Sequence, residues 1–85
     1  MSKKQQTQKN LELSVSLADF IAKHPNLSKT VISGASVVPF SMSDKKLNKE
    51  NDKLVEELLE EGKKVVKAQE PKNHRNPWQF SPVSA

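Results

Sequence analysis

The chain has 85 residues, no cysteine and a formal net charge of +4. This length allows one small domain, and a domain of about 60 residues buries only about 60% of the surface that its unfolded chain exposes, so we expect marginal stability. The lack of cysteine excludes disulfides and thiolate zinc sites. No apolar run approaches the roughly 20 residues of a membrane-spanning helix, and the N-terminus lacks the apolar core of a secretory signal. We therefore expect a soluble, cytoplasmic protein with no membrane partner.

The positive charge lies mainly near the two ends of the sequence. Residues 1–10 contain three lysines and residues 62–85 are also basic, whereas the segment from Asp44 to Glu61 has more acids than lysines. Basic charge at flexible ends usually indicates solvated tails. A surface that binds nucleic acid is the alternative interpretation.

The first third of the chain predicts a disordered segment followed by a helix. Residues 1–9 are rich in Gln and Lys without apolar periodicity, so we predict that they are disordered. Residues 11–17 alternate like a half-buried strand, but over a longer window four polar residues recur at helical spacing and favour a helix: Glu12, Ser16, Asp19 and Lys23. We expect this helix to begin near Asn10, which can cap it, and to end near Lys23, because Pro25 disfavours helical dihedrals in the residue before it.

The centre of the sequence predicts a strand–helix–strand unit. Residues 35–40 and residues 64–69 are short apolar runs, and an amphipathic helix lies between them, from about Asp44 to Glu61. The inner face of this helix repeats at spacings of three and four residues and consists of Leu47, Asn51, Leu54, Val55, Leu58 and Leu59. Because a helix-length segment connects the two strands, we expect them to be parallel.

The predicted fold class is α+β. We expect a small helix–strand–helix–strand domain over residues 10–70, with a two-stranded parallel sheet as its core. Residues 71–85 contain three prolines and are expected to form an extended tail. A two-stranded sheet leaves an open edge, and natural proteins cover, charge or pair such edges. We therefore expect dimerisation to extend the sheet.

The sequence contains no pattern that is typical of catalysis or of ligand binding. It has no Gly-x-Ser-x-Gly elbow, and the single glycine ahead of the first strand does not make a phosphate-binding loop. The two histidines, His24 and His74, lack the spacing of metal ligands. We therefore predict no catalytic residue, no cofactor and no metal, and we expect a protein that is not an enzyme.

Four residues are candidates for binding a partner: Asn51, Arg75, Trp78 and Phe80. Asn51 interrupts the apolar face of the central helix, where an unsatisfied amide costs about 1 to 3 kcal/mol. It bonds either to a turn or loop carbonyl of its own chain or to a second copy. Trp78 and Phe80 follow the last predicted strand, and tryptophan is unusual in a disordered tail. They either dock on the domain itself or, with Arg75 beside them, anchor another protein.

The order of these features resembles an uncharacterised prokaryotic domain family of unknown function. The shared features are a first helix ending in His24-Pro25-x-Leu27, Gly34-Ala35 ahead of an apolar strand, Asn51 in the second helix, and Gly62 followed by Val65-Val66. The resemblance covers residues 10 to about 70. It implies an α+β fold and carries over no catalytic residue, cofactor or partner.

Two functions from different classes remain open. The leading hypothesis is a non-enzymatic protein–protein interaction or accessory module that acts as a homodimer and binds an unidentified protein. The alternative is weak nucleic-acid binding through the basic tails, with an affinity that falls steeply as salt is raised.

Overall fold

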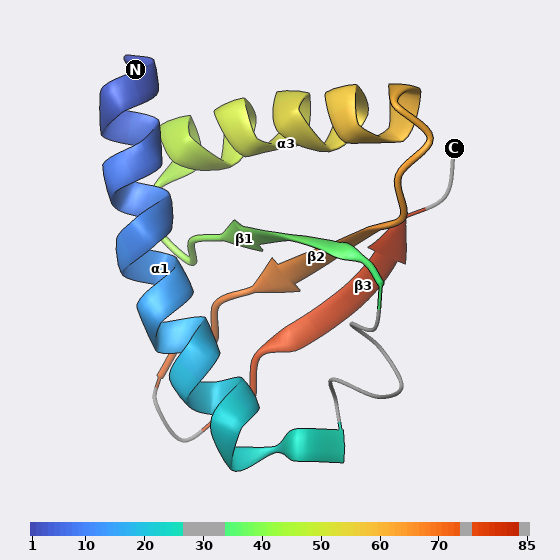
Figure 1. Cartoon of the computed structure of the whole chain (residues 1–85). Coiled ribbons are helices and arrows are strands. Elements are labelled where there is room, and N and C mark those ends of the chain that lie inside the picture. The colour runs from blue at the N-terminus through green and yellow to red at the C-terminus, as the bar shows by residue number, and fades with distance from the viewer. Residues whose placement is uncertain (27–33, 74–75, 84–85) are drawn as a thin grey trace.

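The structure is a computed structural model that describes residues 1–26, 34–73 and 76–83. Its elements follow in the order α1 (Lys3–Lys23), β1 (Ser36–Phe40), α3 (Lys45–Glu60), β2 (Val65–Gln69) and β3 (Gln79–Val83). The strands form one sheet in the order β1-β2-β3, in which β1 is parallel and β3 antiparallel to β2. The predicted α+β class and the parallel strand–helix–strand unit are confirmed. Figure 1 shows α3 along one side of the sheet and α1 crossing beside the end of β1.

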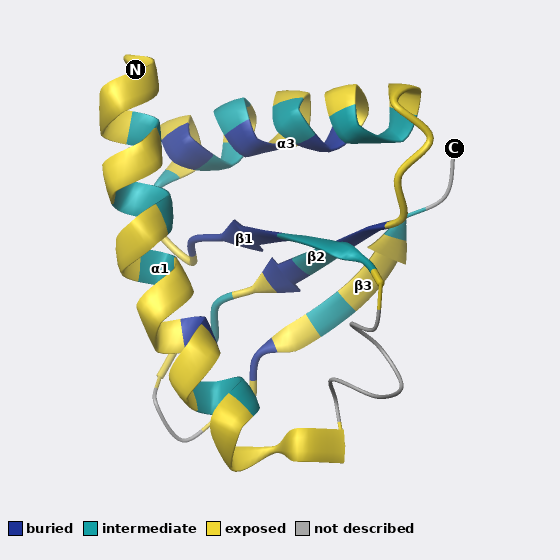
Figure 2. Cartoon of the chain, in the orientation of Figure 1, coloured by how far each residue is buried: buried dark blue, intermediate teal, exposed yellow. Residues whose placement is uncertain are grey.

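The two faces of the sheet carry separate apolar clusters, because successive strand side chains point to opposite faces. On one face, Phe40 and Val65 pack with Val55 of α3. On the other face, Ala68 packs with Leu17 of α1. Figure 2 shows buried residues within β1 and β2 and on the side of α3 that is turned toward the sheet. The small core is therefore divided between the two helices.

Helix α3 packs through the face that the apolar spacing predicts. Leu47 and Val55 are buried, while Leu54, Leu58 and Leu59 are partly buried and pack at the margin of the same cluster. Asp44 caps the helix by accepting a hydrogen bond from the backbone N–H of Leu47. Beyond the other end, Gly62 adopts a φ of 80°, a left-handed conformation that glycine adopts readily at helix ends.

The prediction that residues 1–9 are disordered is wrong, because α1 already begins at Lys3. Ser2 and Gln5 form a capping box: the Gln5 N–H donates to Ser2 Oγ, and the Ser2 N–H donates to Gln5 Oε1. Gln6 then bonds to the side chain of Asn51 in α3, and Lys9 bonds to that of Asp44, the N-cap of α3. These contacts hold a polar segment that has no apolar pattern of its own.

The prediction of a two-stranded sheet is also wrong, because Gln79–Val83 forms a third strand within the predicted tail. Phe80 lies opposite Ala68, and Val83 lies opposite Val65. The chain's own C-terminal segment therefore occupies the edge of β2 that a two-stranded sheet would leave open.

Both outer edges of the sheet carry a proline. The Glu70 N–H donates to the Phe40 carbonyl, so even-numbered residues of β2 direct their peptide groups toward β1 and odd-numbered residues toward β3. The registers then place the nitrogens of Pro39 and Pro82 on the outer edges. Proline cannot donate a ladder hydrogen bond, so both edges are poor templates for a strand of another molecule.

Candidate interaction surface

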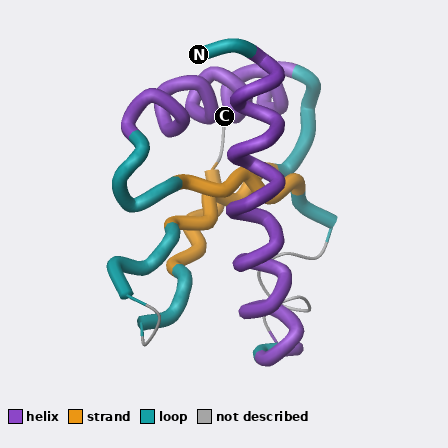
Figure 3. The backbone as a smooth tube through the Cα atoms, turned by 90° about the vertical axis from the view of Figure 1, so that its left-hand side faces the viewer, coloured by secondary structure: helices purple, strands orange, loops and turns teal. Residues whose placement is uncertain are grey.

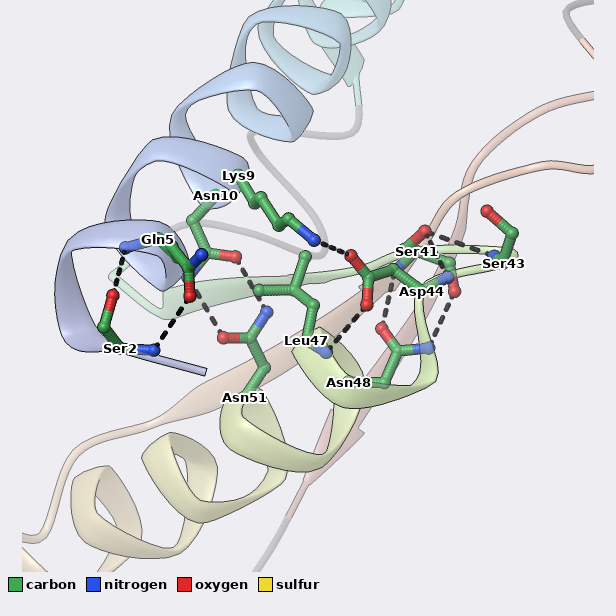
Figure 4. A network of polar contacts seen from close by, with 10 residues as sticks. All are labelled: Ser2, Gln5, Lys9, Asn10, Ser41, Ser43, Asp44, Leu47, Asn48 and Asn51. Carbon is green, nitrogen blue, oxygen red and sulfur yellow. Dashed lines mark hydrogen bonds and ion pairs between the residues drawn. The ribbon is translucent and has the colours of Figure 1, made fainter.

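Asn51 is fully buried where α1 crosses α3 (Figure 4). Its Nδ2 donates to Asn10 Oδ1 and to the Pro39 carbonyl, at 2.8 Å in each case. Its Oδ1 accepts from Asn10 Nδ2 and Gln6 Nε2, both at 3.0 Å. These four bonds use the full capacity of the amide. Asn51 therefore joins α1, β1 and α3 of one chain, and its carbonyl partner lies in a strand rather than in a turn or loop.

The turn between β1 and α3 is closed by side chains, as Figure 4 also shows. The Ser41 N–H donates to Asn48 Oδ1 at 2.7 Å, and Asn48 Nδ2 donates back to the Ser41 carbonyl at 2.8 Å. Asp44 accepts from the Leu47 N–H at 3.0 Å and binds Lys9 Nζ at 2.6 Å. The hydrogen bond from Lys9, reinforced by the Leu47 N–H, holds the pKa of Asp44 below its ordinary value. This network fixes the turn and the first half of α1.

Trp78 and Phe80 dock on their own domain. Trp78 is 7% exposed and packs with Leu17 and Ala68. Phe80 packs against the same cluster, with its ring centroid 6.3 Å from that of Phe20. Trp78 therefore belongs to the core of its own domain, and Phe80 packs, partly buried, at the margin of the same cluster. Arg75 lies outside the described residues.

The outer face of α1 leaves apolar side chains uncovered. Leu11 and Val15 are 58% and 65% exposed. Ala18 and Ala22 are exposed as well, and their spacing continues the row along the helix, away from the buried Leu17. We call Leu11, Val15, Ala18 and Ala22 the outer stripe.

A hollow of about 900 Å³ adjoins the outer stripe at Val15. Phe20 and His24 line it from α1, and Pro77 and Trp78 line it from the segment that precedes β3. His24 stacks on Phe20 with ring centroids 4.2 Å apart, and its Nδ1 lies 2.9 Å from the Phe20 carbonyl oxygen. His24 thus packs on Phe20 at the end of α1.

Charged groups are sparse around this hollow. Of those that line it, Asp19 and Lys23 form an ion pair with each other at 3.1 Å. Among the described residues, no group of three or more His, Asp or Glu side chains is placed to hold a metal ion. The hollow and the outer stripe adjoin each other on α1 and share Val15.

Sequence reasoning missed the outer stripe and the contacts of Gln6 and Lys9. The Ser-x-x-Gln pattern at residues 2–5 is a capping-box signal for a helix that begins there. The alternation over residues 11–17 places apolar side chains on more than one side of a helix, and this pattern is the signal for a second apolar face.

Comparison of the chain with protein-family models, with curated proteins and with solved structures gave no match. In the described parts of the chain, no helix has the length and apolar character needed to cross a membrane.

Proposed function

We propose that the chain is a non-enzymatic interaction module that acts as a homodimer through the outer stripe of α1. The exposure of Leu11 and Val15, at 58% and 65%, carries the proposal. Among the described residues, the other exposed large apolar side chains are Met1 and Met42, and they are less exposed, at 40% and 54%. Burying an aliphatic side chain contributes roughly 1.5 to 3 kcal/mol, so this row favours association with a matching surface.

The order of large and small residues along the outer stripe favours a second copy as the occupant. In an antiparallel pair of α1 helices related by a two-fold axis, Leu11 of each copy faces Ala22 of the other, and Val15 faces Ala18. Large side chains then meet small ones, so the helices approach closely and interdigitate. The spacing of four, three and four residues is also that of a two-helix seam.

Charges beside the outer stripe fit the same arrangement. Glu12 and Lys23 lie on one flank of α1, near opposite ends of the outer stripe. An antiparallel pair brings these flanks together, with Glu12 of each copy near Lys23 of the other. Lys23 pairs at present with Asp19, and both side chains are largely exposed, so Lys23 is free to turn. Ion pairs at such a rim add little affinity but favour one orientation.

The edges of the sheet support the choice of a helix surface. Pro39 and Pro82 make strand addition unfavourable at both outer edges. We expect a weak dimer, because two Leu11 and two Val15 side chains contribute roughly 6 to 12 kcal/mol if fully buried. Association itself costs about 4 to 15 kcal/mol, so the dissociation constant should be micromolar or weaker.

Sedimentation velocity on the full chain and two variants tests the proposal. The wild-type mass should rise from one chain toward two between about 10 µM and about 1 mM. Val15→Glu should remain a monomer, because dimerisation would bury its carboxylate without a partner.

Met42→Glu is the matched control, because Met42 is 54% exposed and lies outside the outer stripe. This variant should dimerise like the wild type. A wild-type chain that stays monomeric throughout this range overturns the proposal, and so does equal dimerisation of the wild type and Val15→Glu.

A further inference from the structure

The charges of α3 run against its helix dipole. The amino-terminal half of its outer face carries the lysines Lys45, Lys46 and Lys49. The other half carries the acids Glu56, Glu57 and Glu60. The first turn has no acidic residue and the last turn no basic one. A helix dipole favours the opposite order, so this arrangement lowers the stability of α3.

The start of α1 adds further lysines to the same corner of the molecule. Gln6 bonds to Asn51 and Lys9 bonds to Asp44. In the sequence, the three α3 lysines lie between Asp44 and Asn51, and all three are exposed. Figure 1 likewise shows the start of α1 beside the first turns of α3. The first turn of α1 is itself basic and has no acid. We define the lysine corner as Lys3, Lys4, Lys45, Lys46 and Lys49.

The charges of the lysine corner are not neutralised by neighbours. All five side chains are exposed, and none forms an ion pair with a described residue. Of the acids nearby in sequence, Asp44 binds Lys9 and caps α3, Glu50 lies 3.8 Å from Lys53, and Asp52 binds Lys67 at 3.0 Å. The side chains of Ser2 and Asp44 already cap the N-terminal ends of α1 and α3. The groups that remain available to a ligand are therefore ammonium groups.

The tube in Figure 3 shows the backbone from the side of α1, with the start of this helix next to α3 and its other end beyond the sheet. The outer stripe begins at Leu11, past the first two turns of α1, so it occupies a different part of the helix from the lysine corner. An anion bound at the lysine corner and a second chain bound at the outer stripe therefore use separate residues.

We propose that the lysine corner binds the phosphate backbone of nucleic acid without reading its base sequence. Lysines that neutralise phosphates release counterions, which provides sequence-independent affinity. The lysine corner contains no arginine and no aromatic residue, the side chains that most often read base edges or stack on bases. A bound polyanion relieves the repulsion between these lysines and the helix dipoles. This site goes beyond the proposed homodimer and does not depend on it.

Fluorescence anisotropy with labelled DNA duplexes of two unrelated sequences tests the proposal on the full chain. Both duplexes should bind equally. The logarithm of the binding constant should fall linearly with the logarithm of salt concentration, with a slope of about −4.5 if each of the five lysines contacts about one phosphate. Absence of salt-dependent binding, or strong preference for one sequence, overturns the proposal.

A triple variant locates the site. Lys45→Gln, Lys46→Gln and Lys49→Gln together should weaken binding at low salt at least tenfold and make the slope shallower by about 3. The same variant should melt at a higher temperature, because it removes cations from the positive end of α3. Loss of binding in a more stable protein cannot be ascribed to unfolding.

The matched control carries the same change of charge at exposed lysines elsewhere: Lys63→Gln, Lys64→Gln and Lys72→Gln. It should keep the wild-type slope. If both triple variants lose the same DNA affinity, the attraction depends on net charge alone and the proposed site is wrong. Tighter binding to anionic lipid vesicles than to DNA also overturns the proposal. Val15→Glu should bind DNA with an unchanged slope per chain, which separates this test from that of the homodimer.

Discussion

Asn10 of α1 and Asn51 of α3 form a reciprocal amide pair, in which Asn51 Nδ2 donates at 2.8 Å and Asn10 Nδ2 donates at 3.0 Å. The two residues are 41 positions apart in the sequence. Asn51 also holds the Pro39 carbonyl on the outer edge of the sheet. Because Asn51 is fully buried, water does not replace a partner that is lost. One side chain therefore positions the first half of α1 on the rest of the domain.

The first prediction concerns this pair. Asn51→Ala should destabilise the fold by about 1 to 3 kcal/mol, because the Pro39 carbonyl loses its hydrogen-bond donor. The cavity left by the missing amide should add to this cost. Asn10→Ala should cost less, because Asn10 is only partly buried and Asn51 keeps two other bonds. Urea unfolding of the two variants measures the difference. Equal destabilisation by Asn51→Ala and Asn10→Ala would show that Asn51 is not the main residue that positions α1.

The second prediction is a dependence of stability on pH through Asp44. The contact with Lys9 lowers the pKa of Asp44 in the folded state. Its contribution to stability is therefore complete above the unfolded-state pKa of about 3.9 and is lost as the pH falls through the lower folded-state pKa. Asp44→Asn keeps a good N-cap but loses the charge.

Thermal melts of wild type and Asp44→Asn between about pH 7 and pH 2 check this second prediction. The gap between the two melting temperatures should be constant at neutral pH and should shrink in acid. Parallel curves over the whole range would rule out a stabilising contact between Asp44 and Lys9.

The third prediction concerns Trp78, the single tryptophan of the chain. Its fluorescence should be blue-shifted in the native protein and should shift to the red on unfolding, because the indole is buried against Leu17 and Ala68. Trp78→Ala should cost about 3 to 5 kcal/mol, most of the stability of so small a domain. Trp78→Phe, which keeps an aromatic ring, should cost less. Native emission typical of indole in water would contradict the packing of this segment.

Local sequence signals were sufficient for α3 but not for the ends of the chain. The residues that predict α3, which are its regularly spaced apolar residues and its cap at Asp44, lie within the helix or next to it. Residues 3–9 have the capping-box signal of Ser2 and Gln5 but no apolar spacing. Their partners Asp44 and Asn51 are 35 and 45 positions away, so a local pattern does not identify them. The third strand was missed because Pro82 argues against a strand interior. In the sheet, however, its nitrogen faces the outer edge, where no ladder bond is lost.

The candidate surface was predictable only in part. Asn51 was recognisable as a polar residue on an apolar face, but its partners come from α1 and β1, which the helix pattern does not identify. Residues 11–17 place apolar side chains on two sides of α1. Only the tertiary structure shows that the sheet covers Leu17 and leaves Leu11 and Val15 exposed. Which side of a helix stays free depends on distant strands, so a local pattern could not decide it.

Disulfide cross-linking across the outer stripe tests the homodimer most directly. The chain has no cysteine, so introduced thiols report only on their own positions. An antiparallel pair places residue 15 of one copy opposite residue 18 of the other. On oxidation of an equimolar mixture, Val15→Cys protein and size-tagged Ala18→Cys protein should form the mixed disulfide faster than either forms a disulfide with itself. They should also react faster than Val15→Cys with Met42→Cys. If the mixed disulfide forms no faster than in that Met42 control, the outer stripes do not meet in solution and the account is contradicted.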